Sequence, residues 1–433
     1  MLLFLVALTG ITFSKFPKDI PTIPFYFALL PLVSNNDQVE LYRKYLERPL
    51  TEFGAVKLFF GGHWNILVRK PAYIAEVLKN EDIYAKSGNQ KKIPHSVLAE
   101  YTGDNIISSH GENWRLYTSI FKPGLQQDYD LAPVSSNARL LVQLIEEQQD
   151  AVGFVNVLLG SSFETMQTPT APLHTFQLRI KPKIFNPIFL SFPFLNYRPL
   201  PTRKEARSLV TEFTEFTDTL CKTVQNGHSP TCHEQGTNPR NLGCRLLSAF
   251  ESSLLTEKQL RHNMISAFLA GHENPYIGNT TKPPRRTLFF SYQRKSKPRT
   301  PPLLTSTIHE SLRLYPPISQ LINRRTTEPT TLGRDIKIPI PAGTYIGYNA
   351  YSTNRDIDFW GPDANEFRPE RWGTKIEEIN ALFRRGECQG ACLGARFGLA
   401  EWGVDESWVG GMTRAGPLYA RDLRLRVSRV GNL

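Results

Sequence analysis

The pattern of apolar and polar positions near the start of the chain predicts a β-hairpin. Residues 55–60 read AVKLFF, residues 65–68 read NILV, and the stretch GGHW brings two glycines between them. Two β-rich runs joined by a short glycine-containing turn are typical of a hairpin. A second β-rich stretch covers residues 335–351 and turns at 341–343, which read PAG.

Helical spacing of apolar residues dominates the rest of the chain. It predicts helices over residues 71–82, 206–224 and 255–270. Many helices with small sheets towards both ends indicate a mainly α fold of the α+β class. Residues 276–300 are basic and proline-rich and lack a helical period, and residues 165–174 show no clear element either. We interpret both stretches as loop, insertion or disorder.

Composition narrows the class of protein. With 433 residues, of which 40% are hydrophobic, the chain can bury a large core. Its 51 Lys and Arg against 40 Asp and Glu give a net charge of +11. Such a charge suits an anionic membrane surface or an acidic protein partner. The sequence shows no nucleic-acid-binding motif, so we expect no nucleic acid partner.

The first residues form an apolar run from Leu2 to Phe13. The run is shorter than the ~20 residues that a membrane-spanning helix needs. It is compatible with a short membrane anchor, the core of a secretory signal or a buried N-terminus. The proline-rich stretch that follows favours the anchor, because it is typical of a stiff linker. Residues 1–18 are therefore predicted as anchor and start of the linker, and residues 19–433 as one domain.

Cys392 is the first candidate for chemistry. It lies in GECQGACLGARFGLAE, two residues before Gly394 and just ahead of a predicted helix over 395–401. A thiolate before a helix N-terminus is stabilised by the helix dipole and by free backbone N–H groups. Gly394 would let the backbone pass close to a flat macrocycle, although a buried structural cysteine is the simpler explanation of the isolated pattern.

The chain has five cysteines in all, a sparse and odd number for its length, which argues against a disulfide framework and for a reducing compartment. A metal site remains an alternative in one segment, although its spacing matches no common zinc motif; its four candidate ligands are His228, Cys232, His233 and Cys244.

Glu310 and Arg313 lie three residues apart in a predicted helix that reads LLTSTIHESLRLYPP. They can pair on one helix face, and an ordinary surface pair is the simplest alternative. A third charge, Arg371, follows in the stretch NEFRPERW. A buried set of one carboxylate and two guanidinium groups would satisfy its own hydrogen bonds.

A further candidate lies in MISAFLAGHENP, where Glu273 and Asn274 follow a small Ala-Gly pair and precede a proline. The small pair lets a helix approach a flat cofactor, and a distorted turn can hold water for proton delivery. A helix that ends at a solvated polar cap is the alternative.

Taken in this order, these motifs resemble those of the cytochrome P450 superfamily. The resemblance implies a large helical bundle around haem b, with small β-sheets, and a haem-thiolate oxidoreductase of the monooxygenase type. It also implies NADPH–cytochrome P450 reductase as electron donor and a place on the cytosolic face of the endoplasmic reticulum membrane.

Site residues follow from the same resemblance. Cys392 becomes the iron ligand, with Gly394 beside it, and Glu273 and Asn274 become the residues on the oxygen side. The structural triad is Glu310, Arg313 and Arg371. Haem propionates would be bound by Trp114 and Arg115, in GENWRLY, and by Arg324 or Arg325, in LINRRTT.

Several stretches look more closely like the fungal dityrosine-pathway enzymes, which are N-formyltyrosine oxidases of the spore wall; they are PTIPFYFALLP, AKSGNQKKIPHSVLAEYTGDNIIS and LYPPISQLINRRTT. This likeness implies a small aromatic substrate and oxidative phenol coupling. Most members of the superfamily have Thr in place of Asn274, and an amide relays protons less readily than a hydroxyl. A generic fungal monooxygenase that hydroxylates an apolar metabolite is the alternative.

The haem loop departs from the family pattern. Arg385, Cys388 and Gly390 stand where the family has Phe, Gly and Arg. Residues 276–300 replace expected helices, and the stretch after Glu401 is short. These departures predict a mis-spliced or truncated gene, with a non-catalytic remnant as the alternative function.

Overall fold

The computed structural model describes residues 17, 19–34, 36–126, 172–197, 199–225, 242–267, 302–316, 318–333, 337–372, 403–404 and 425–426. The chain divides into two compact units. The first comprises Met1–Leu58, Trp64–Tyr84 and Asn274–Leu433, and the second Phe59–His63 and Ala85–Glu273.

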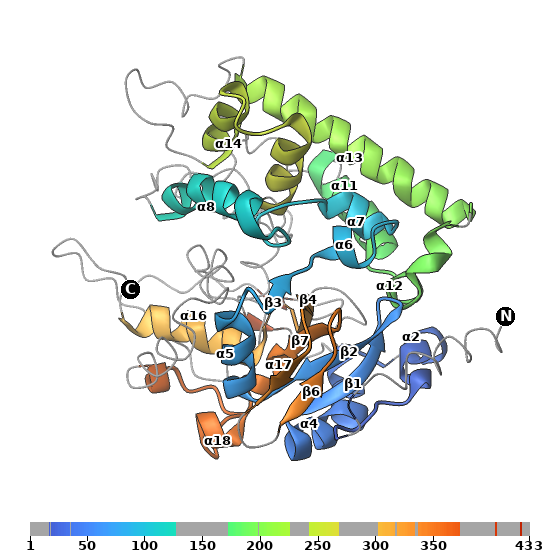
Figure 1. Cartoon of the computed structure of the whole chain (residues 1–433). Coiled ribbons are helices and arrows are strands. Elements are labelled where there is room, and N and C mark those ends of the chain that lie inside the picture. Colours follow the sequence, from blue (N-terminus) through green and yellow to red (C-terminus); the bar gives the residue numbers. More distant parts are fainter. Residues whose placement is uncertain are drawn as a thin grey trace. The chain divides into compact units, whose positions relative to one another are not determined.

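The first unit is built on a five-stranded sheet with the order β1-β2-β7-β4-β3 (Figure 1). Its strands are β1 (Ala55–Phe60), β2 (His63–Val68), β3 (Tyr84–Lys86), β4 (Gln320–Thr326) and β7 (Tyr345–Asn349). β7 pairs in parallel with β2 and antiparallel with β4. Strands from both ends of the sequence therefore form one sheet.

The predicted hairpin is confirmed. β1 and β2 are joined by Gly61 and Gly62, whose φ angles are 64° and 76°. Two consecutive positive φ angles match the tight hairpin turn that follows the twist of the strands, and glycine adopts them without strain.

Helix α5 (Pro71–Lys79) covers one face of the sheet. Its residues Tyr73, Ile74, Val77 and Leu78 share one buried apolar cluster with side chains of β2 and β7. Proline at the first position suits a helix start, because its missing N–H would have no partner there. The apolar spacing in the sequence thus identified the face that is buried.

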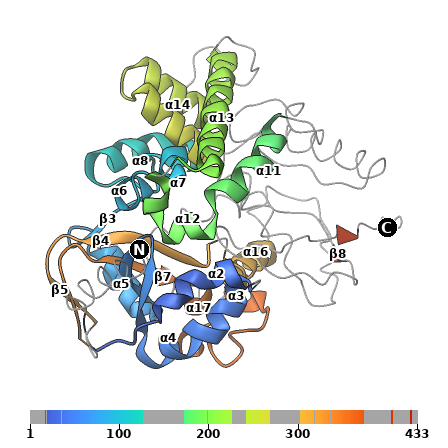
Figure 2. The same cartoon turned by 90° about the vertical axis from the view of Figure 1, so that its right-hand side faces the viewer.

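The N-terminal part of this unit is a series of short helices, which Figure 2 shows beside α17 (Ala350–Thr353). They are η1 (Phe25–Leu29), α2 (Leu30–Val33), α3 (Gln38–Leu41), η2 (Tyr42–Leu46) and α4 (Glu47–Phe53). Tyr42 links them to α17, since its hydroxyl donates a hydrogen bond of 2.9 Å to Ser352 and its ring packs edge-on against Tyr351.

The remaining elements of the first unit include α16 (Pro302–Leu314), α18 (Ile357–Trp360) and η5 (Pro369–Arg371). Two small antiparallel pairs complete them: β5 (Thr330–Leu332) with β6 (Ile338–Ile340), and β8 (Gly403–Val404) with β9 (Leu425–Arg426). The β-rich stretch predicted over 335–351 corresponds to β6 and β7.

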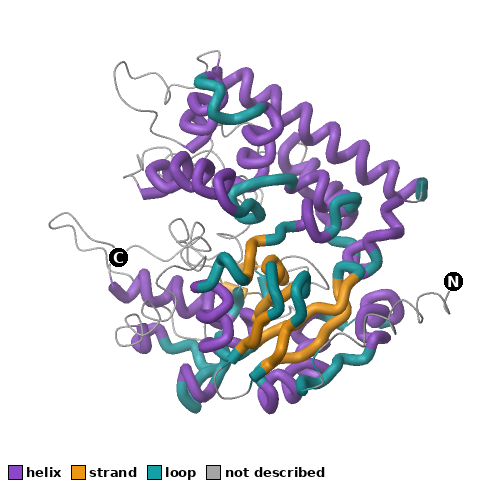
Figure 3. The backbone as a smooth tube through the Cα atoms, viewed as in Figure 1, coloured by secondary structure: helices purple, strands orange, loops and turns teal. Residues whose placement is uncertain are grey.

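The described part of the second unit is mainly helical, and Figure 3 draws helices in purple. Its helices are α6 (Asn89–Lys92), α7 (Val97–Thr102), α8 (Gly111–Gln126), α11 (Pro172–Ile184), α12 (Pro187–Ser191), η4 (Pro193–Tyr197), α13 (Pro201–Gln225), α14 (Leu242–Glu251) and residues 257–267. α13 packs against α7, α11 and α14. It contains the helix predicted over 206–224, while α11 begins inside the stretch 165–174 that showed no element in the sequence.

The loop between α7 and α8 is fixed to helical residues 257–267. The backbone N–H of Asp104 donates to Nδ1 of His262 at 3.1 Å, and that of Ile106 donates to Oδ1 of Asn263 at 3.0 Å. The Asp104 carboxylate in turn accepts from Gln90, Asn113 and Tyr117, each at 3.1 Å. Buried side chains thus replace regular secondary structure in holding this loop.

In the part of the chain that the structure describes, no helix is long and apolar enough to cross a membrane. The apolar run Leu2–Phe13 lies outside the described residues, as does the stretch 276–300.

Candidate functional site

Glu310 and Arg313 lie on the buried face of α16. Their exposed fractions are 0% and 3%, so the surface-pair alternative is wrong. A spacing of three residues places both side chains on one side of a helix. Nε and Nη2 of Arg313 each donate to one carboxylate oxygen of Glu310 at 2.8 Å. This two-pronged geometry is the strongest form of an arginine–carboxylate pair.

The Glu310 carboxylate accepts three further hydrogen bonds from residues 368–372, the segment around η5. They come from Nε of Arg371 at 3.0 Å, from the backbone N–H of Arg368 at 2.8 Å and from the indole N–H of Trp372 at 3.0 Å. A buried carboxylate needs such partners, because burial without them costs several kcal/mol. Glu310 is therefore the centre of the cluster.

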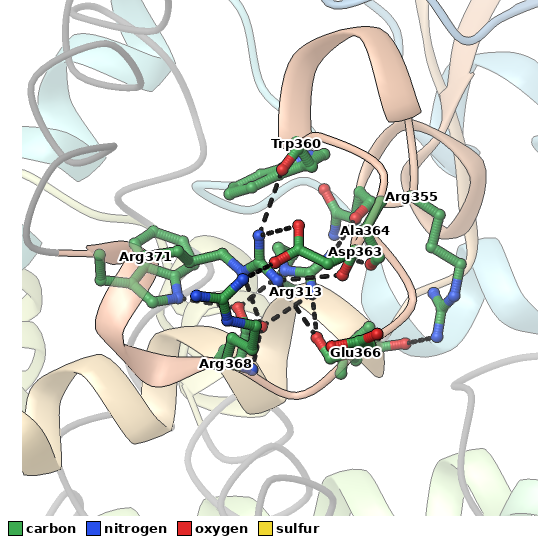
Figure 4. Close-up of polar contacts among 12 residues, drawn as sticks. Arg313, Arg355, Trp360, Asp363, Ala364, Glu366, Arg368 and Arg371 are labelled. Carbon is green, nitrogen blue, oxygen red and sulfur yellow. Dashed lines mark hydrogen bonds and ion pairs between the residues drawn. The ribbon is translucent and has the colours of Figure 1, made fainter.

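Arg313 uses the rest of its guanidinium on backbone carbonyls (Figure 4). Nη1 donates to the carbonyls of Asn354 and Ala364, each at 2.6 Å, and Nη2 also donates to that of Glu366 at 3.0 Å. A guanidinium has five N–H donors. All five are engaged here, so Arg313 fixes two loop segments to α16.

Arg371 has an equally complete set of partners. Besides Glu310, it donates to Oδ1 of Asp363 and to the carbonyl of Trp360 at 3.2 Å each, and to the carbonyl of Asp363 at 3.0 Å. Asp363 also pairs with Arg368. Hydrogen bonds from Arg371, followed by those from Arg368, lower the pKa of Asp363.

Four side chains form this cluster, the carboxylates of Glu310 and Asp363 and the guanidinium groups of Arg313 and Arg371, while the exposed Arg368 pairs with Asp363 from outside it. Burial alone would raise the pKa of Glu310, but hydrogen bonds from Arg313 and from the Arg368 backbone, with the charge of Arg313, outweigh it and lower the pKa. The carboxylate is therefore ionised at neutral pH. We call these four residues the Glu310 cluster.

Aromatic rings enclose the Glu310 cluster. The Arg313 guanidinium lies 5.0 Å from the ring centroid of Trp360, and the His309 ring stacks on Trp372 at 4.8 Å. Burial lowers the pKa of His309. No motif in the sequence marks Asp363 or Trp360 as a partner, because most contacts in this region go to backbone carbonyls.

Trp114 and Arg115 lie in the first turns of α8. The ammonium of Lys86, itself only 4% exposed, lies 4.6 Å from the centroid of the Trp114 ring. Arg115 is exposed and forms no ion pair with any described residue. Its guanidinium is thus available to a carboxylate such as a haem propionate, and this donor chemistry fits the group.

Arg324 and Arg325 project from β4 with different partners. Arg324 is 1% exposed; it donates to the carbonyl of Tyr84 at 3.2 Å and lies 3.3 Å from the Glu81 carboxylate. Nε of the exposed Arg325 donates to the carbonyl of Gly343 at 3.2 Å. Arg324 already has a carboxylate partner in this arrangement, so its role towards a propionate stays a prediction.

Cys392, Gly394, Glu273 and Asn274 lie outside the described residues, so their predicted roles stay predictions.

The alternative metal site loses one ligand, because Cys244 is part of a disulfide and not a free thiol. This bond also departs from the expectation that the cysteines are reduced. Among the described residues, no group of three or more His, Cys, Asp or Glu side chains could hold a metal ion.

A comparison with family models matches the Cytochrome P450 family to residues 17–277 and 299–401. The chain belongs to the cytochrome P450 family. The match covers most of both compact units and includes every candidate site residue. The match leaves out the residues between 277 and 299. They lie inside the basic, proline-rich stretch 276–300, for which the sequence predicts no helix.

Two fungal cytochromes P450 are similar over most of the chain. Cytochrome P450-DIT2 of Saccharomyces cerevisiae is 38% identical over 467 aligned positions, which cover 95% of this chain and 93% of the yeast protein. Cytochrome P450 monooxygenase xanG of Aspergillus fumigatus is 39% identical over 433 positions, covering 88% of this chain and 79% of that protein. The yeast alignment is longer than this chain, so the yeast protein has stretches without a counterpart here.

The predictions of a cytochrome P450 fold, of a fungal family and of an oxidoreductase are therefore confirmed. Family membership also implies a haem iron cofactor, and P450 enzymes generally take electrons from a reductase. The Glu310 cluster is a feature of this chain that the structure places fully within its first unit.

Proposed function

We propose that this cytochrome P450 oxidises N-formyltyrosine and couples two molecules of it to a dityrosine for the spore wall. The observation that carries the proposal is the similarity over 95% of the chain to a fungal P450, together with the stretches that resemble N-formyltyrosine oxidases. The balanced reaction joins two phenols, one O2 and one NADPH with a proton to give the dimer, NADP⁺ and two waters.

We propose Cys392 as the haem ligand, with Gly394 beside it and with Trp114 and Arg115 at one propionate. Haem supplies the activation of dioxygen and the one-electron oxidation of the phenols. The chain's own residues position the group: the Glu310 cluster holds α16 and the segment before Trp372 together, and Arg115 offers an exposed guanidinium. On the oxygen side, Glu273 and Asn274 would hold water and move protons.

The substrate is tested by incubating the haem-loaded enzyme with P450 reductase, NADPH and N-formyltyrosine. We expect a product whose mass is twice that of the substrate less two hydrogens. A product heavier by one oxygen, with no dimer, would favour the alternative of a generic monooxygenase.

The ligand is tested separately by the carbon monoxide spectrum of the reduced protein. We expect the red-shifted Soret band of a thiolate ligand in the native chain and in Cys388→Ser, and its loss in Cys392→Ser. Loss of the band in Cys388→Ser alone would make the upstream cysteine the ligand.

A non-catalytic remnant is the second candidate, favoured by the gap in the family match between residues 277 and 299. Sequencing of the transcript tests this candidate. A spliced message that encodes Phe, Gly and Arg ahead of Cys392 would argue against a non-catalytic remnant. A native protein that takes up no haem would support it.

We also propose that the chain is bound to the cytosolic face of the endoplasmic reticulum membrane through residues 1–18, where a P450 reductase is its electron donor. The supporting observations are the apolar run Leu2–Phe13 and the net charge of +11.

A further inference from the structure

Asp104, in the loop between α7 and α8, divides its carboxylate between two sets of partners. Its Oδ1 accepts from Nε2 of Gln90 in α6 at 3.1 Å and from the hydroxyl of Ser109 in the same loop. Its Oδ2 accepts from Nδ2 of Asn113 and from the hydroxyl of Tyr117, each at 3.1 Å, and both belong to α8. One oxygen therefore binds α6 and the loop, and the other binds α8.

The backbone of Asp104 is fixed independently of its side chain. Its N–H donates to Nδ1 of His262 at 3.1 Å, and the N–H of Ile106 donates to Oδ1 of Asn263 at 3.0 Å. His262 and Asn263 are 8% and 0% exposed, so both acceptors belong to the buried part of the second unit. The carboxylate is therefore presented to α8 by a loop that is itself anchored.

The contacts of Asp104 with α8 all come from one face of that helix. Asn113 and Tyr117 are four residues apart, which places them on the same side. Successive residues of an α-helix are rotated by about 100°, so Trp114 lies about 100° and Arg115 about 200° around α8 from Asn113. Two hydrogen bonds to one fixed oxygen resist rotation of α8 about its axis. They therefore set the direction in which Trp114 and Arg115 project.

The two α8 side chains that would reach haem differ in how firmly they are held. The Trp114 ring has the ammonium of Lys86 4.6 Å from its centroid. Arg115 is exposed. Tyr117, by contrast, is 0% exposed, and burial, followed by the charge of Asp104, raises its pKa to about 12, so its hydroxyl stays a donor. The direction of Arg115 thus depends on how α8 itself is held.

We infer that Asp104 is a positioning residue for haem, which sets the direction of Trp114 and Arg115 and so the strength with which they bind a propionate. The inference rests on the proposed role of these two residues. Hydrogen bonds between a guanidinium and a carboxylate depend on their direction, so a rotated helix weakens them while Arg115 itself is unchanged.

The sign of the effect distinguishes positioning from simple electrostatics. Asp104 and a propionate are both negative, so the charge of Asp104 by itself weakens haem binding. Removal of that charge would then slow the release of haem. Positioning predicts the opposite, because the loss of the carboxylate frees α8.

The test measures the rate at which the haem-loaded protein releases haem to an excess of apomyoglobin, followed by the change in the Soret band. Asp104→Asn keeps the size of the side chain and the backbone N–H, and Tyr117→Phe keeps the charge and the ring. We expect Asp104→Asn to release haem about 10-fold faster, as the weakening of one charge-assisted hydrogen bond predicts. Tyr117→Phe should change the rate in the same direction. Unchanged release from either variant, or slower release from Asp104→Asn, would overturn the inference.

Asp218→Asn is the matched control for a general loss of stability. Asp218 of α13 accepts from Nε and Nη2 of Arg261 at 3.0 and 2.8 Å, so this variant also breaks a carboxylate contact with helical residues 257–267. Urea midpoints show how far each variant is destabilised. We expect Asp218→Asn to release haem at the native rate. Equal acceleration in Asp104→Asn and Asp218→Asn would overturn the inference, because stability alone would then explain it.

A double-mutant cycle with Arg115→Ala tests whether Asp104 acts through Arg115. Residues that act through one another have effects that do not add. Asp104→Asn should therefore accelerate haem release less in the Arg115→Ala background than in the native chain. The same fold-change in both backgrounds, or native release from Arg115→Ala alone, would overturn the inference.

The inference and the proposed function can fail separately. A native enzyme that forms the dimer while Asp104→Asn releases haem at the native rate would retain the function and remove the role of Asp104. A native enzyme that forms no dimer, but whose variants release haem faster as described, would retain the role of Asp104 and remove the coupling reaction. A native protein that takes up no haem would overturn both.

Discussion

At the scale of single residues, Glu310 carries a charge that the fold cannot leave unpaired. In Glu310→Gln the side chain keeps its size, but Arg313 and Arg371 lose their common counter-charge. We expect the free energy of unfolding to fall by about 3–5 kcal/mol, as for other broken buried pairs. Urea unfolding followed by circular dichroism measures it.

The matched control is Glu52→Gln. Glu52 pairs with Arg48 at 2.8 Å, but the two side chains are 48% and 87% exposed. Exposed pairs of this kind contribute little, so the change should stay within about 0.5 kcal/mol. A similar loss of stability in both variants would mean that burial does not decide the contribution of Glu310.

Sequence reasoning predicted part of this cluster. The spacing of Glu310 and Arg313 predicted that they pair, because three residues bring two side chains to one helix face. It did not predict Asp363, which comes from a loop, or the carbonyls of Asn354 and Ala364 that Arg313 contacts. Backbone acceptors carry no residue identity, so only the folded chain reveals them.

At the scale of elements, Gly103 sets how closely the loop after α7 approaches helical residues 257–267. Its φ is 53°, and a Cβ atom would lie 2.0 Å from the His262 ring. Gly103→Ala should therefore displace either the loop or the ring, and lower the free energy of unfolding by clearly more than backbone strain alone. The urea midpoint measures this.

Gly111→Ala is the control for that substitution. Gly111 also has a positive φ, 67°, but a Cβ atom there would meet nothing within 4 Å. Backbone strain alone should cost about 1 kcal/mol. Equal losses in the two variants would show that the close approach to His262 has no effect of its own.

The elements themselves were predicted unevenly. The hairpin, α5, α13 and α16 follow apolar periodicity, and each was expected close to where it lies. α11 was missed because its first residues are rich in Pro and Thr, which weaken a helical signal. A β-bulge between Ile322 and Arg324 of β4 was not foreseeable either, since it depends on register with β7, which lies some twenty residues further along the chain.

At the scale of the whole molecule, stability should fall on mild acidification. Burial, and then the neighbouring Lys258, lowers the pKa of His262 from 6.5 to about 4. Between these values the unfolded chain binds a proton that the folded chain does not, so stability present above pH 6.5 is lost as the pH falls towards 4. The lowered pKa of Glu310 acts in the same direction at still lower pH.

The His262→Asn variant checks this assignment, because asparagine can accept the Asp104 N–H without titrating. Urea midpoints from pH 7.5 to 5 should fall less steeply than in the native protein. Some slope should remain, since the pKa of His309 is also lowered. Identical slopes in the two proteins would remove His262 as the cause.

The parallel pairing of β2 with β7 has a consequence for synthesis on the ribosome. Asn65 pairs with Tyr345 and Val68 with Tyr348, so β2 emerges long before its partner exists. Until then one edge of an apolar strand is uncovered, and uncovered edges promote aggregation. The described helices of the second unit can pack in the meantime. Any message that stops translation before residue 345 would thus release a chain whose first strands have lost their neighbour, which makes it a substrate for chaperones and proteases.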